Sequence, residues 1–346
     1  MYRPVYTITN LMLREVGNID AAKAIIDASP LLPAWEKRFQ DDALVRAVHH
    51  GTHLEGNELN IAEARRIIEG EQIAGRPRDV QEIINYRNVI DFIGKEQLED
   101  SLPKELDEDL LKSLHRLTAE NILEEDKTGV YRGSQVVVRN SYTGEVSFRP
   151  PPAVEIPYLT REFLNWLKDE LKTHPIIKAG IVHFELVRIH PFVDGNGRVA
   201  RAFTAALLYK EHYDTRRFFS LEEHYDRDAV SYYKALQSVT DSDLTPWLEY
   251  FVEGLAIEFM RVKQKVMKIS RDLKFQHVIG GQVYLGNRQI KVIEYIQEHG
   301  FMQNSAFKAI FPDISDDTVL RELKDLVTKG IIKKRGRTKA ARYVLA

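Results

Sequence analysis

The sequence predicts a mainly α-helical protein with one short β-hairpin, followed by a small C-terminal module of helices and a second hairpin. Apolar residues recur at helical spacing over most of the 346 residues. Strand-like patterns occur only near residues 135–149 and 331–345. A glycine-containing stretch at 280–287 separates the tail from the preceding helices. A chain of this length favours two or three domains.

The composition is that of an ordinary globular protein, with 44% hydrophobic and 29% charged residues. Cysteine is absent, which excludes a disulfide scaffold, a cysteine nucleophile and a cysteine-ligated zinc. We find no signal peptide and no apolar run of the roughly 20 residues that span a bilayer. We therefore expect a cytoplasmic protein. With a net charge of −2, the chain as a whole lacks the excess of basic residues that is typical of nucleic-acid-binding proteins.

Residues 1–100 are expected to form a helical extension. Helices are predicted over 42–54 and 81–93 from their apolar spacing. Between them, Asn60 and Glu63 have the spacing of a capping box, which predicts the start of a further helix.

In the next part of the chain, the spacing of apolar residues changes from helical to strand-like and then becomes helical again. Residues 106–122 predict a helix with leucines on one face, whereas 135–139 and 145–149 predict two strands joined by a turn. Pro150 ends the hairpin, because proline cannot donate to a strand ladder. Residues 159–276 read as successive helices.

The most informative segment runs from His190 to Arg201 and reads HPFVDGNGRVAR. Residues 194–197 predict a tight turn in which the glycines can take positive φ. An apolar helix follows, so the turn leads into a helix N-terminus. Free backbone N–H groups and the helix dipole make such a terminus an anion site.

Charged side chains surround this expected anion site. Arg198 and Arg201 lie three residues apart and therefore on one helix face, which suits a polyphosphate. Asp194 offers the hard oxygen that Mg²⁺ prefers. His190 can accept a proton near neutral pH.

This segment matches every defined position of H-P-F-x-[D/E]-G-N-G-R-x-x-R, the motif of the Fic (filamentation induced by cAMP) family. Residues 179–190 resemble the helix that leads into that motif. The resemblance covers about 106–258 and implies a Fic-type helical core. The alternative, an ordinary Gly-Asn-Gly turn beside a core histidine, does not account for the whole string.

The resemblance implies an enzyme that transfers AMP from ATP to a Ser, Thr or Tyr hydroxyl of a protein, with Mg²⁺ as cofactor. His190 would take the proton of the hydroxyl, and Asp194 would hold the metal. The nucleotide phosphates would be bound by Gly195, Asn196, Gly197, Arg198 and Arg201. A branch that transfers phosphate instead has lysine at the position of Gly197, so glycine favours AMP transfer.

The predicted hairpin at 135–149 corresponds to the family's flap, which pairs with the backbone of the target protein as an added strand. A purely structural hairpin is the alternative. Tyr232 and Tyr233 lie where the family often has aromatic residues near the adenine, although an aromatic pair in a helix is more often part of the core.

The segment Thr52–Asn57 resembles the family's inhibitory motif, [S/T]-x-x-x-E-[G/N]. Glu55 would pair with Arg201 and block the γ-phosphate site. The sequence departs from the motif at Gly51, where the hydroxyl is expected. The alternative is a plain surface glutamate before a helix stop. In some family members this glutamate also supports removal of AMP.

Two further features are less specific. His49, His50 and His53 have a zinc-capable spacing but lack the His-Glu-x-x-His pattern of metalloproteases, so we assign them no metal. Residues 288–346 resemble a winged helix and carry twelve Lys/Arg against seven Asp/Glu, a net charge of +5. We expect residues 316–329 to form the recognition helix and residues 333–339 to form the wing. This module would contact DNA, a protein or a second copy of the chain. Asp316 opposes DNA contact.

We therefore expect a helical extension over 1–100, a Fic core over 101–260, a helical linker over 261–287 and a winged helix over 288–346. The leading hypothesis is a protein adenylyltransferase inhibited by Glu55. The alternatives are an enzyme that both adds and removes AMP, and a DNA-binding regulator whose Fic core senses a nucleotide.

Overall fold

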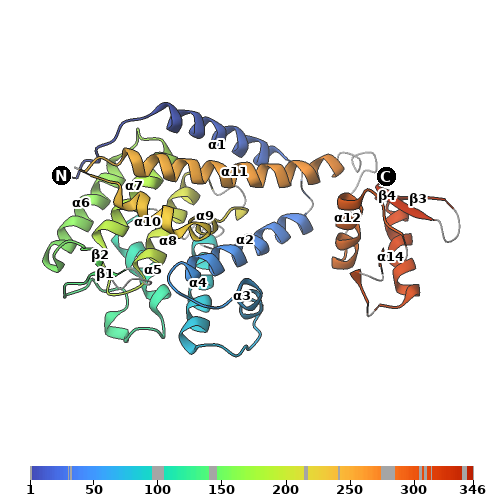
Figure 1. Cartoon of the computed structure of the whole chain (residues 1–346), viewed down its shortest axis with the longest axis horizontal. Coiled ribbons are helices and arrows are strands. Elements are labelled where there is room, and N and C mark those ends of the chain that lie inside the picture. Colours follow the sequence, from blue (N-terminus) through green and yellow to red (C-terminus); the bar gives the residue numbers. More distant parts are fainter. Residues whose placement is uncertain are drawn as a thin grey trace. The chain divides into compact units, whose positions relative to one another are not determined.

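The computed structural model is mainly helical, as the sequence predicts (Figure 1). It forms two compact units, one of residues Met1–Asp27 and Lys37–Lys263 and one of Ala28–Glu36 and Gln264–Ala346. The structure describes residues 2–29, 31, 33–95, 105–139, 146–213, 217–240, 242–273, 285–303, 306–307, 310–312, 314–336 and 341–345. Within these ranges, no helix is both long enough and apolar enough to cross a membrane.

The chain begins with α1 (Asn10–Ala28), α2 (Pro33–His53), α3 (Ile61–Ile68) and α4 (Pro77–Lys95). Asn60 caps α3, and Glu63 returns the bond to the backbone of Asn60, so the predicted capping box is confirmed. Helix α4 starts four residues before the expected Gln81. Proline at its first position is compatible with a helix start, because the first turn needs no N–H donor there.

The core of the first unit consists of α5 (Glu108–Ala119), α6 (Ile156–Asp169), α7 (Pro175–Ile189) and α8 (Asn196–Lys210). Helices α7 and α8 pack on each other at the centre, with α4 and α5 against α8 and α6 against α7. Almost every residue of α7 is buried, which fits its apolar sequence on all sides. Each fully buried Ile, Leu or Phe contributes about 1.5–3 kcal/mol.

The rest of this unit covers the central helices. It includes α9 (Leu221–Arg227), α10 (Ala229–Gln237) and α11 (Thr245–Leu273), and the short 3-10 turns η1 (Glu125–Lys127) and η2 (Ala153–Glu155). Figure 1 shows α1 along the first part of α11, and Thr9 donates to Glu249 at 2.7 Å. Trp247 on α11 donates to the carbonyl of Gly180 on α7 at 2.8 Å.

The predicted hairpin is present but shorter than expected. Strand β1 (Val138–Arg139) pairs antiparallel with β2 (Val146–Phe148). The residues of the expected turn, 140–144, and the first residue of the expected second strand, Glu145, lie outside the described ranges.

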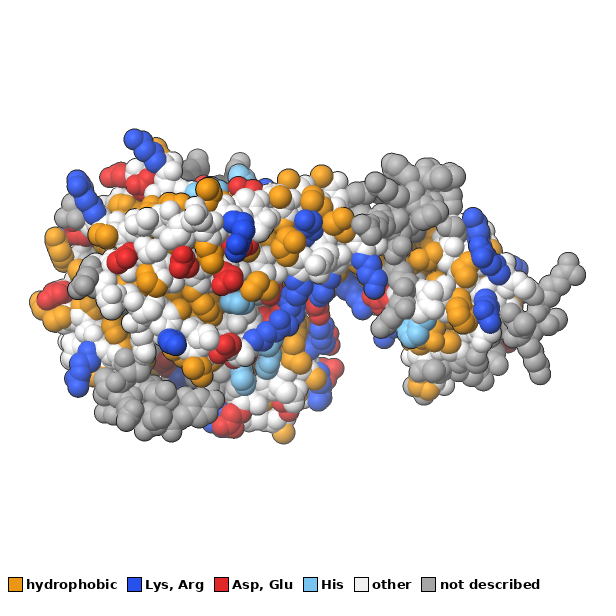
Figure 2. Space-filling model, turned by 45° about the horizontal axis from the view of Figure 1, so that its top comes forward, with side chains coloured by type: hydrophobic (Ala, Val, Ile, Leu, Met, Phe, Trp, Pro, Cys, Tyr) orange, Lys and Arg blue, Asp and Glu red, His pale blue; other side chains and the backbone are white. Residues whose placement is uncertain are grey.

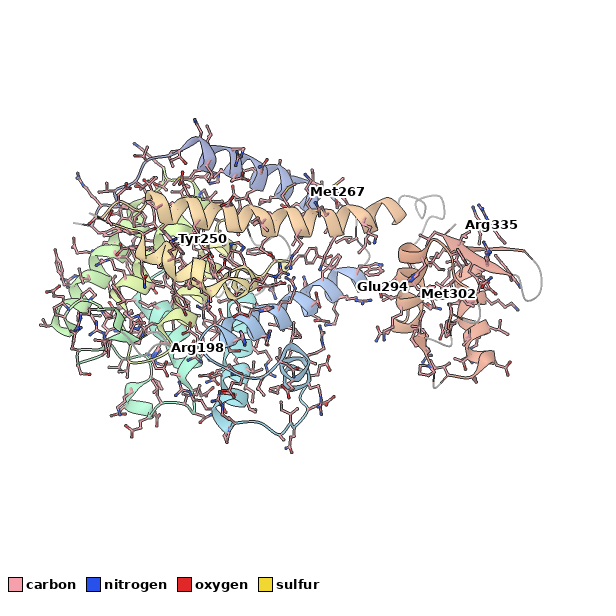
Figure 3. All side chains as sticks on the ribbon, in the orientation of Figure 1. Arg198, Tyr250, Met267, Glu294, Met302 and Arg335 are labelled. Carbon is pink, nitrogen blue, oxygen red and sulfur yellow. The ribbon has the colours of Figure 1, made fainter. Side chains whose placement is uncertain are left out.

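The second unit contains α12 (Asn287–His299), α14 (Asp316–Thr328) and the antiparallel strands β3 (Ile332–Arg335) and β4 (Arg342–Leu345). Met302 pairs with Tyr343 through two 2.8 Å backbone bonds and is fully buried (Figure 3). The order of helices and hairpin is the one expected, but the wing expected at 333–339 falls partly outside the described residues. The assignment as a winged helix stays a prediction.

Candidate active site

His190 ends α7 and takes the left-handed conformation, with φ 51°. Its Nδ1 lies 3.3 Å from the carbonyl oxygen of Val187. A carbonyl can only accept, so Nδ1 carries the hydrogen and Nε2 remains as a proton acceptor. Burial lowers the pKa of His190, although the carboxylates of Glu55 and Asp194 oppose the shift. The imidazole is therefore neutral at physiological pH, as a general base requires.

The loop after His190 is held from inside the protein. Phe192 is fully buried, and both its backbone N–H and its carbonyl bond to the side chain of Asn196, at 2.8 and 2.9 Å. The ring of Phe192 stacks on His115 at 3.8 Å. His115 accepts from the N–H of Gly129 at 2.7 Å and its Nε2 donates to the carbonyl of Asp194 at 3.1 Å.

Arg132 supports the same loop from outside α7. Its Nε donates to the carbonyl of His190 at 2.9 Å, and its backbone N–H donates to Pro191 at 2.9 Å. Neither Arg132 nor His115 was singled out from the sequence. His115 could have been suspected, because it lies on the buried face of α5 next to Leu111 and Leu114.

The turn before α8 is shorter than predicted. Gly195 is its N-cap, with φ +75°, and the helix already begins at Asn196. Gly197 is therefore in the first helical turn, and the expectation of positive φ there is wrong. A Cβ on Gly197 would lie 2.1 Å from Oε1 of Glu55, so glycine is needed for close approach.

Two buried arginines line the start of α8. Arg198 is 2% exposed and has Asp194 at 3.7 Å and Glu82 at 3.4 Å. Arg201 is 4% exposed and donates through Nη2 to the carbonyl of Gly51 and to Glu55 Oε1, both at 2.8 Å.

Part of the hydrogen-bonding capacity of these arginines is unused. Among the described residues, Nε of each and Nη1 of Arg198 have no hydrogen-bond partner. Buried donors of this kind call for an additional acceptor. Together with the N-terminus of α8, they fit an anion with several oxygens.

Asp194 is held by groups that keep it ionised. Its Oδ1 accepts from the N–H of Gly195 at 2.6 Å, and its Oδ2 accepts from Arg78 at 2.5 Å. Burial alone would raise the pKa of Asp194, but Arg198 and Arg78 outweigh it and the pKa is lowered. An ionised carboxylate here fits Mg²⁺. The contact with Arg78, from α4, was not anticipated.

Glu55 lies in the turn that follows α2, whose last residue is His53. The hydroxyl of Thr52 bonds to the carbonyl of Val48 in its own helix at 2.9 Å. At Gly51, a Cβ would lie 2.5 Å from Cε1 of Tyr86, so the ring of Tyr86 occupies the space of a side chain. Glycine at position 51, where the motif has Ser or Thr, thus makes room for the ring of Tyr86.

The two tyrosines predicted near an adenine differ in their surroundings. Tyr232 is 2% exposed, and its hydroxyl bonds to Nε2 of His183 at 2.9 Å, so it is largely a core residue. Tyr233 is 42% exposed and donates to the carbonyl of Leu54, beside Glu55, at 3.3 Å.

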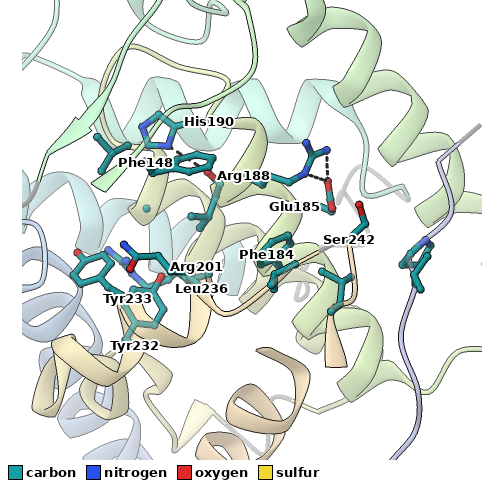
Figure 4. Close-up of a pocket in the computed structure, with 18 of the residues that line it drawn as sticks. Phe148, Phe184, Glu185, Arg188, His190, Arg201, Tyr232, Tyr233, Leu236 and Ser242 are labelled. Atoms are coloured by element: carbon teal, nitrogen blue, oxygen red, sulfur yellow. Dashed lines mark hydrogen bonds and ion pairs between the residues drawn. The ribbon is translucent and has the colours of Figure 1, made fainter. Parts of the chain in front are cut away.

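These residues meet at a cavity of about 850 Å³ (Figure 4). Its wall includes His190, Gly197, Arg201, Glu55 and both tyrosines, and Val138 and Phe148 from the hairpin. Neither Asp194 nor Arg198 is part of this wall. The N-terminal residues Tyr2, Arg3, Pro4 and Val5 also line the cavity.

The fold and the site define a helical domain in which a half-buried histidine and a buried arginine line one cavity. Residues 105–208 match the model of the Fic/DOC family, so the chain contains a Fic/DOC domain and the resemblance seen in the sequence is confirmed. The chain is similar to the protein adenylyltransferases Fic of Drosophila willistoni and Aedes aegypti, with 25% identity over 257 residues and 26% over 246. The alignments cover 72% and 68% of this chain and 48% and 44% of those relatives. The chain spans about half the length of the curated relatives it matches.

Solved structures agree in fold. A Fic family protein from Desulfovibrio desulfuricans G20 superposes with a TM-score of 0.68, covering 100% of this chain and 98% of that one at 22% identity. Fic-1 of C. elegans superposes with a TM-score of 0.60, covering 75% of this chain and 74% of that one at 25% identity.

Proposed function

We propose that this protein transfers AMP from ATP to a hydroxyl of a protein side chain, and that Glu55 inhibits the reaction. The observation that carries the proposal is the combination of a neutral His190 with the buried, partly unpaired donors of Arg198 and Arg201 at the start of α8. The adenylyltransferases named above support the same activity.

The phosphate chain of ATP fits the start of α8. The N–H groups of the first turn and the two guanidinium groups would bind phosphate oxygens, and the lack of a side chain at Gly197 leaves the backbone open to close approach. Asp194 would hold Mg²⁺, which when bound neutralises charge on the phosphates.

The chemistry requires one proton transfer and one displacement. Nε2 of His190 takes the proton of the target hydroxyl, whose oxygen forms a bond to the α-phosphorus. The bond from that phosphorus to the pyrophosphate oxygen breaks, and pyrophosphate leaves. The arginines and the N-terminus of α8 stabilise the charge that develops on the phosphates.

Glu55 opposes this reaction because its carboxylate takes the place of an anion. It lies 2.8 Å from Nη2 of Arg201 and against Gly197, on the wall of the cavity that holds His190. An oxyanion of ATP and this carboxylate compete for the same guanidinium. Movement of the turn after α2 would therefore be needed before ATP binds productively.

The hairpin β1–β2 is the proposed docking site of the target. In a two-stranded sheet each strand has an outer edge, so an extended segment can add as a third strand. Val138 and Phe148 line the same cavity as His190, which would bring the added segment near the base.

The test is transfer of label from ATP that carries it on the α-phosphate, in the presence of Mg²⁺, into the protein itself and into proteins of a lysate. We expect label to rise with Glu55→Gly and to fall by about 10²–10⁴-fold when His190→Ala is added, because a general base contributes that much. ATP binding without label in the Glu55→Gly variant would contradict the proposal and favour a nucleotide-sensing protein.

A further inference from the structure

A second cluster of ionisable side chains lies outside the cavity, where the end of α2 meets α9. One ring nitrogen of His49, one of His50 and a carboxylate oxygen of Asp226 lie within 4.8 Å of one another. Nδ1 of His50 is 2.7 Å from Oδ2 of Asp226, and Nδ1 of His53 is 2.7 Å from Oδ1. Figure 2 shows histidine side chains gathered on one face of the first unit.

The charge states in this cluster suit metal binding. Burial and the neighbouring imidazoles lower the pKa of His49 to about 4, so its ring is neutral and offers a lone pair. Its Nδ1 is buried without a hydrogen-bond partner among the described residues, and such an atom is rare unless something binds it. Burial opposes ionisation of Asp226, but His50 and His53 outweigh it and lower its pKa.

We propose that His49, His50 and Asp226 bind Zn²⁺ or a similar first-row divalent metal ion. Two imidazole nitrogens and one carboxylate oxygen are the donors that such ions select, whereas Mg²⁺ selects oxygen alone. The fourth position is left to water. His53 bonds to the other oxygen of Asp226 and orients the carboxylate.

The cluster must adjust to take the ion, because its ligand atoms lie within 4.8 Å of one another and a tetrahedral site needs them closer. Zn–N bonds of about 2.0–2.1 Å in a tetrahedral site separate two donor atoms by roughly 3.3 Å. The 2.7 Å contact between His50 and Asp226 must therefore open by about half an ångström. Nδ1 of His50 must carry no hydrogen to bind the ion, so the imidazole binds as the tautomer whose hydrogen is on Nε2.

The position of the site connects it to Glu55. Glu55 follows His53 by two residues, and the intervening Leu54 is bonded to Tyr233. An ion that joins α2 to Asp226 on α9 would hold the turn after α2 in place, and with it the contact of Glu55 with Arg201. This consequence rests on the proposed function, whereas the binding of the ion does not.

Binding is tested on the full chain after removal of metals with a chelator. We expect one equivalent of Co²⁺ to bind with the visible absorption of a tetrahedral site, and Zn²⁺ to abolish that absorption. The chain has no cysteine, so thiolates cannot produce this spectrum. A wild-type protein without the absorption overturns the proposal.

Variants then locate the site. His53→Asn should weaken Zn²⁺ binding by roughly 10- to 100-fold, the usual effect of losing an outer partner, and His49→Asn and Asp226→Asn should weaken it by more. His299→Asn, an exposed histidine on α12, is the matched control and should leave the affinity unchanged. Thermal melting checks that each variant is folded. Equal affinity in the wild type, His49→Asn and Asp226→Asn overturns the proposed ligands.

Hydrogen exchange tests the connection to Glu55 without using transfer activity. Zn²⁺ should slow amide exchange over residues 50–57 in the wild type and leave it unchanged in Asp226→Asn. If Zn²⁺ binds but exchange over 50–57 does not change, the connection to Glu55 is overturned. Zn²⁺ should also lower AMP transfer by the wild type but not by Glu55→Gly. If no variant transfers AMP, the proposed function fails while the spectrum and the exchange still decide the metal site.

Discussion

A methyl group on Cα of Gly197 would lie 2.1 Å from Oε1 of Glu55, so the carboxylate that we propose as inhibitory packs directly on the backbone of α8. The same oxygen accepts from Arg201 at 2.8 Å. In the proposed function, Glu55 would therefore compete with a phosphate in two ways, by charge at Arg201 and by volume at Gly197.

The contribution of charge to the proposed inhibition can be measured separately with Glu55→Gln, because this substitution keeps the size of the side chain. A hydrogen bond to a charged group contributes roughly 1 kcal/mol more than a neutral one, so we expect about a fivefold rise in AMP transfer. Glu58→Gln, an exposed neighbour that pairs with Arg76, is the control and should have no effect. Equal activity of the two variants would contradict the role of charge.

The close packing of Glu55 against the backbone of Gly197 is tested by Gly197→Ala. The added methyl must displace the carboxylate of Glu55 from Arg201, which we expect to cost about 1–3 kcal/mol of unfolding free energy. The cost should shrink in a Glu55→Gly background, because the colliding group is gone. Urea unfolding of the two single variants and the double variant measures this coupling. Additive costs would show that the two residues do not interact.

Arg78→Gln is expected to increase the affinity for Mg²⁺. Arg78 lies 2.5 Å from Oδ2 of Asp194 and competes with a metal ion for that oxygen. The Arg78 side chain is 58% exposed, so the pair contributes roughly 0.2–1 kcal/mol, and the half-saturating Mg²⁺ concentration should fall by up to about fivefold. The half-saturating Mg²⁺ concentration is measured by titrating AMP transfer with Mg²⁺ in the Glu55→Gly variant, with and without Arg78→Gln. Arg76→Gln serves as the neighbouring control, and a rise in the required Mg²⁺ would contradict the prediction.

The pH dependence of transfer should reflect the environment of His190. Burial lowers its pKa below 6.5, and the base must be neutral, so the rate should already be at its plateau at neutral pH and fall only in acid. Glu55 opposes this shift, so Glu55→Gly should move the acidic limb to still lower pH. Single-turnover rates across pH provide the measurement. A limb centred above pH 6.5 would rule out the half-buried His190 as the titrating base.

Stability should also depend on pH, through His115. Burial lowers the pKa of His115 from 6.5 to about 4, so its contribution is complete above pH 6.5 and is lost as the pH falls toward 4. Between about pH 7.5 and pH 5 this loss is roughly 2 kcal/mol. Urea unfolding of wild type and His115→Gln should therefore differ less at pH 5 than at pH 7.5. A constant difference would exclude His115 as a source of acid sensitivity.

Local signals predicted much of the fold. Asn60 and Glu63 form their capping box, and the helical segments lie close to their expected ranges, because caps and apolar periodicity act within one element. The pairing of Glu55 with Arg201 was expected only from the resemblance, since 146 residues separate them.

Other contacts of the site had no local signal. Arg78 meets Asp194 across 116 residues, and Arg132 reaches His190 from an irregular segment. Gly197 was misjudged, because sequence alone does not distinguish a glycine that needs positive φ from one that must leave room for a neighbour. That distinction depends on Glu55, which lies in the turn after α2.

The ring of Tyr86 fills the space that a side chain at position 51 would need, and its hydroxyl bonds to Glu222 on α9 at 2.9 Å. Gly51 in turn offers its carbonyl to Arg201. If Glu55 inhibits as proposed, the strength of the inhibition can be adjusted from α4. A smaller residue at position 86 would give the end of α2 freedom to shift, while both Glu55 and Arg201 remain unchanged. Descendants of this protein could acquire different basal activities through Tyr86, which does not line the cavity.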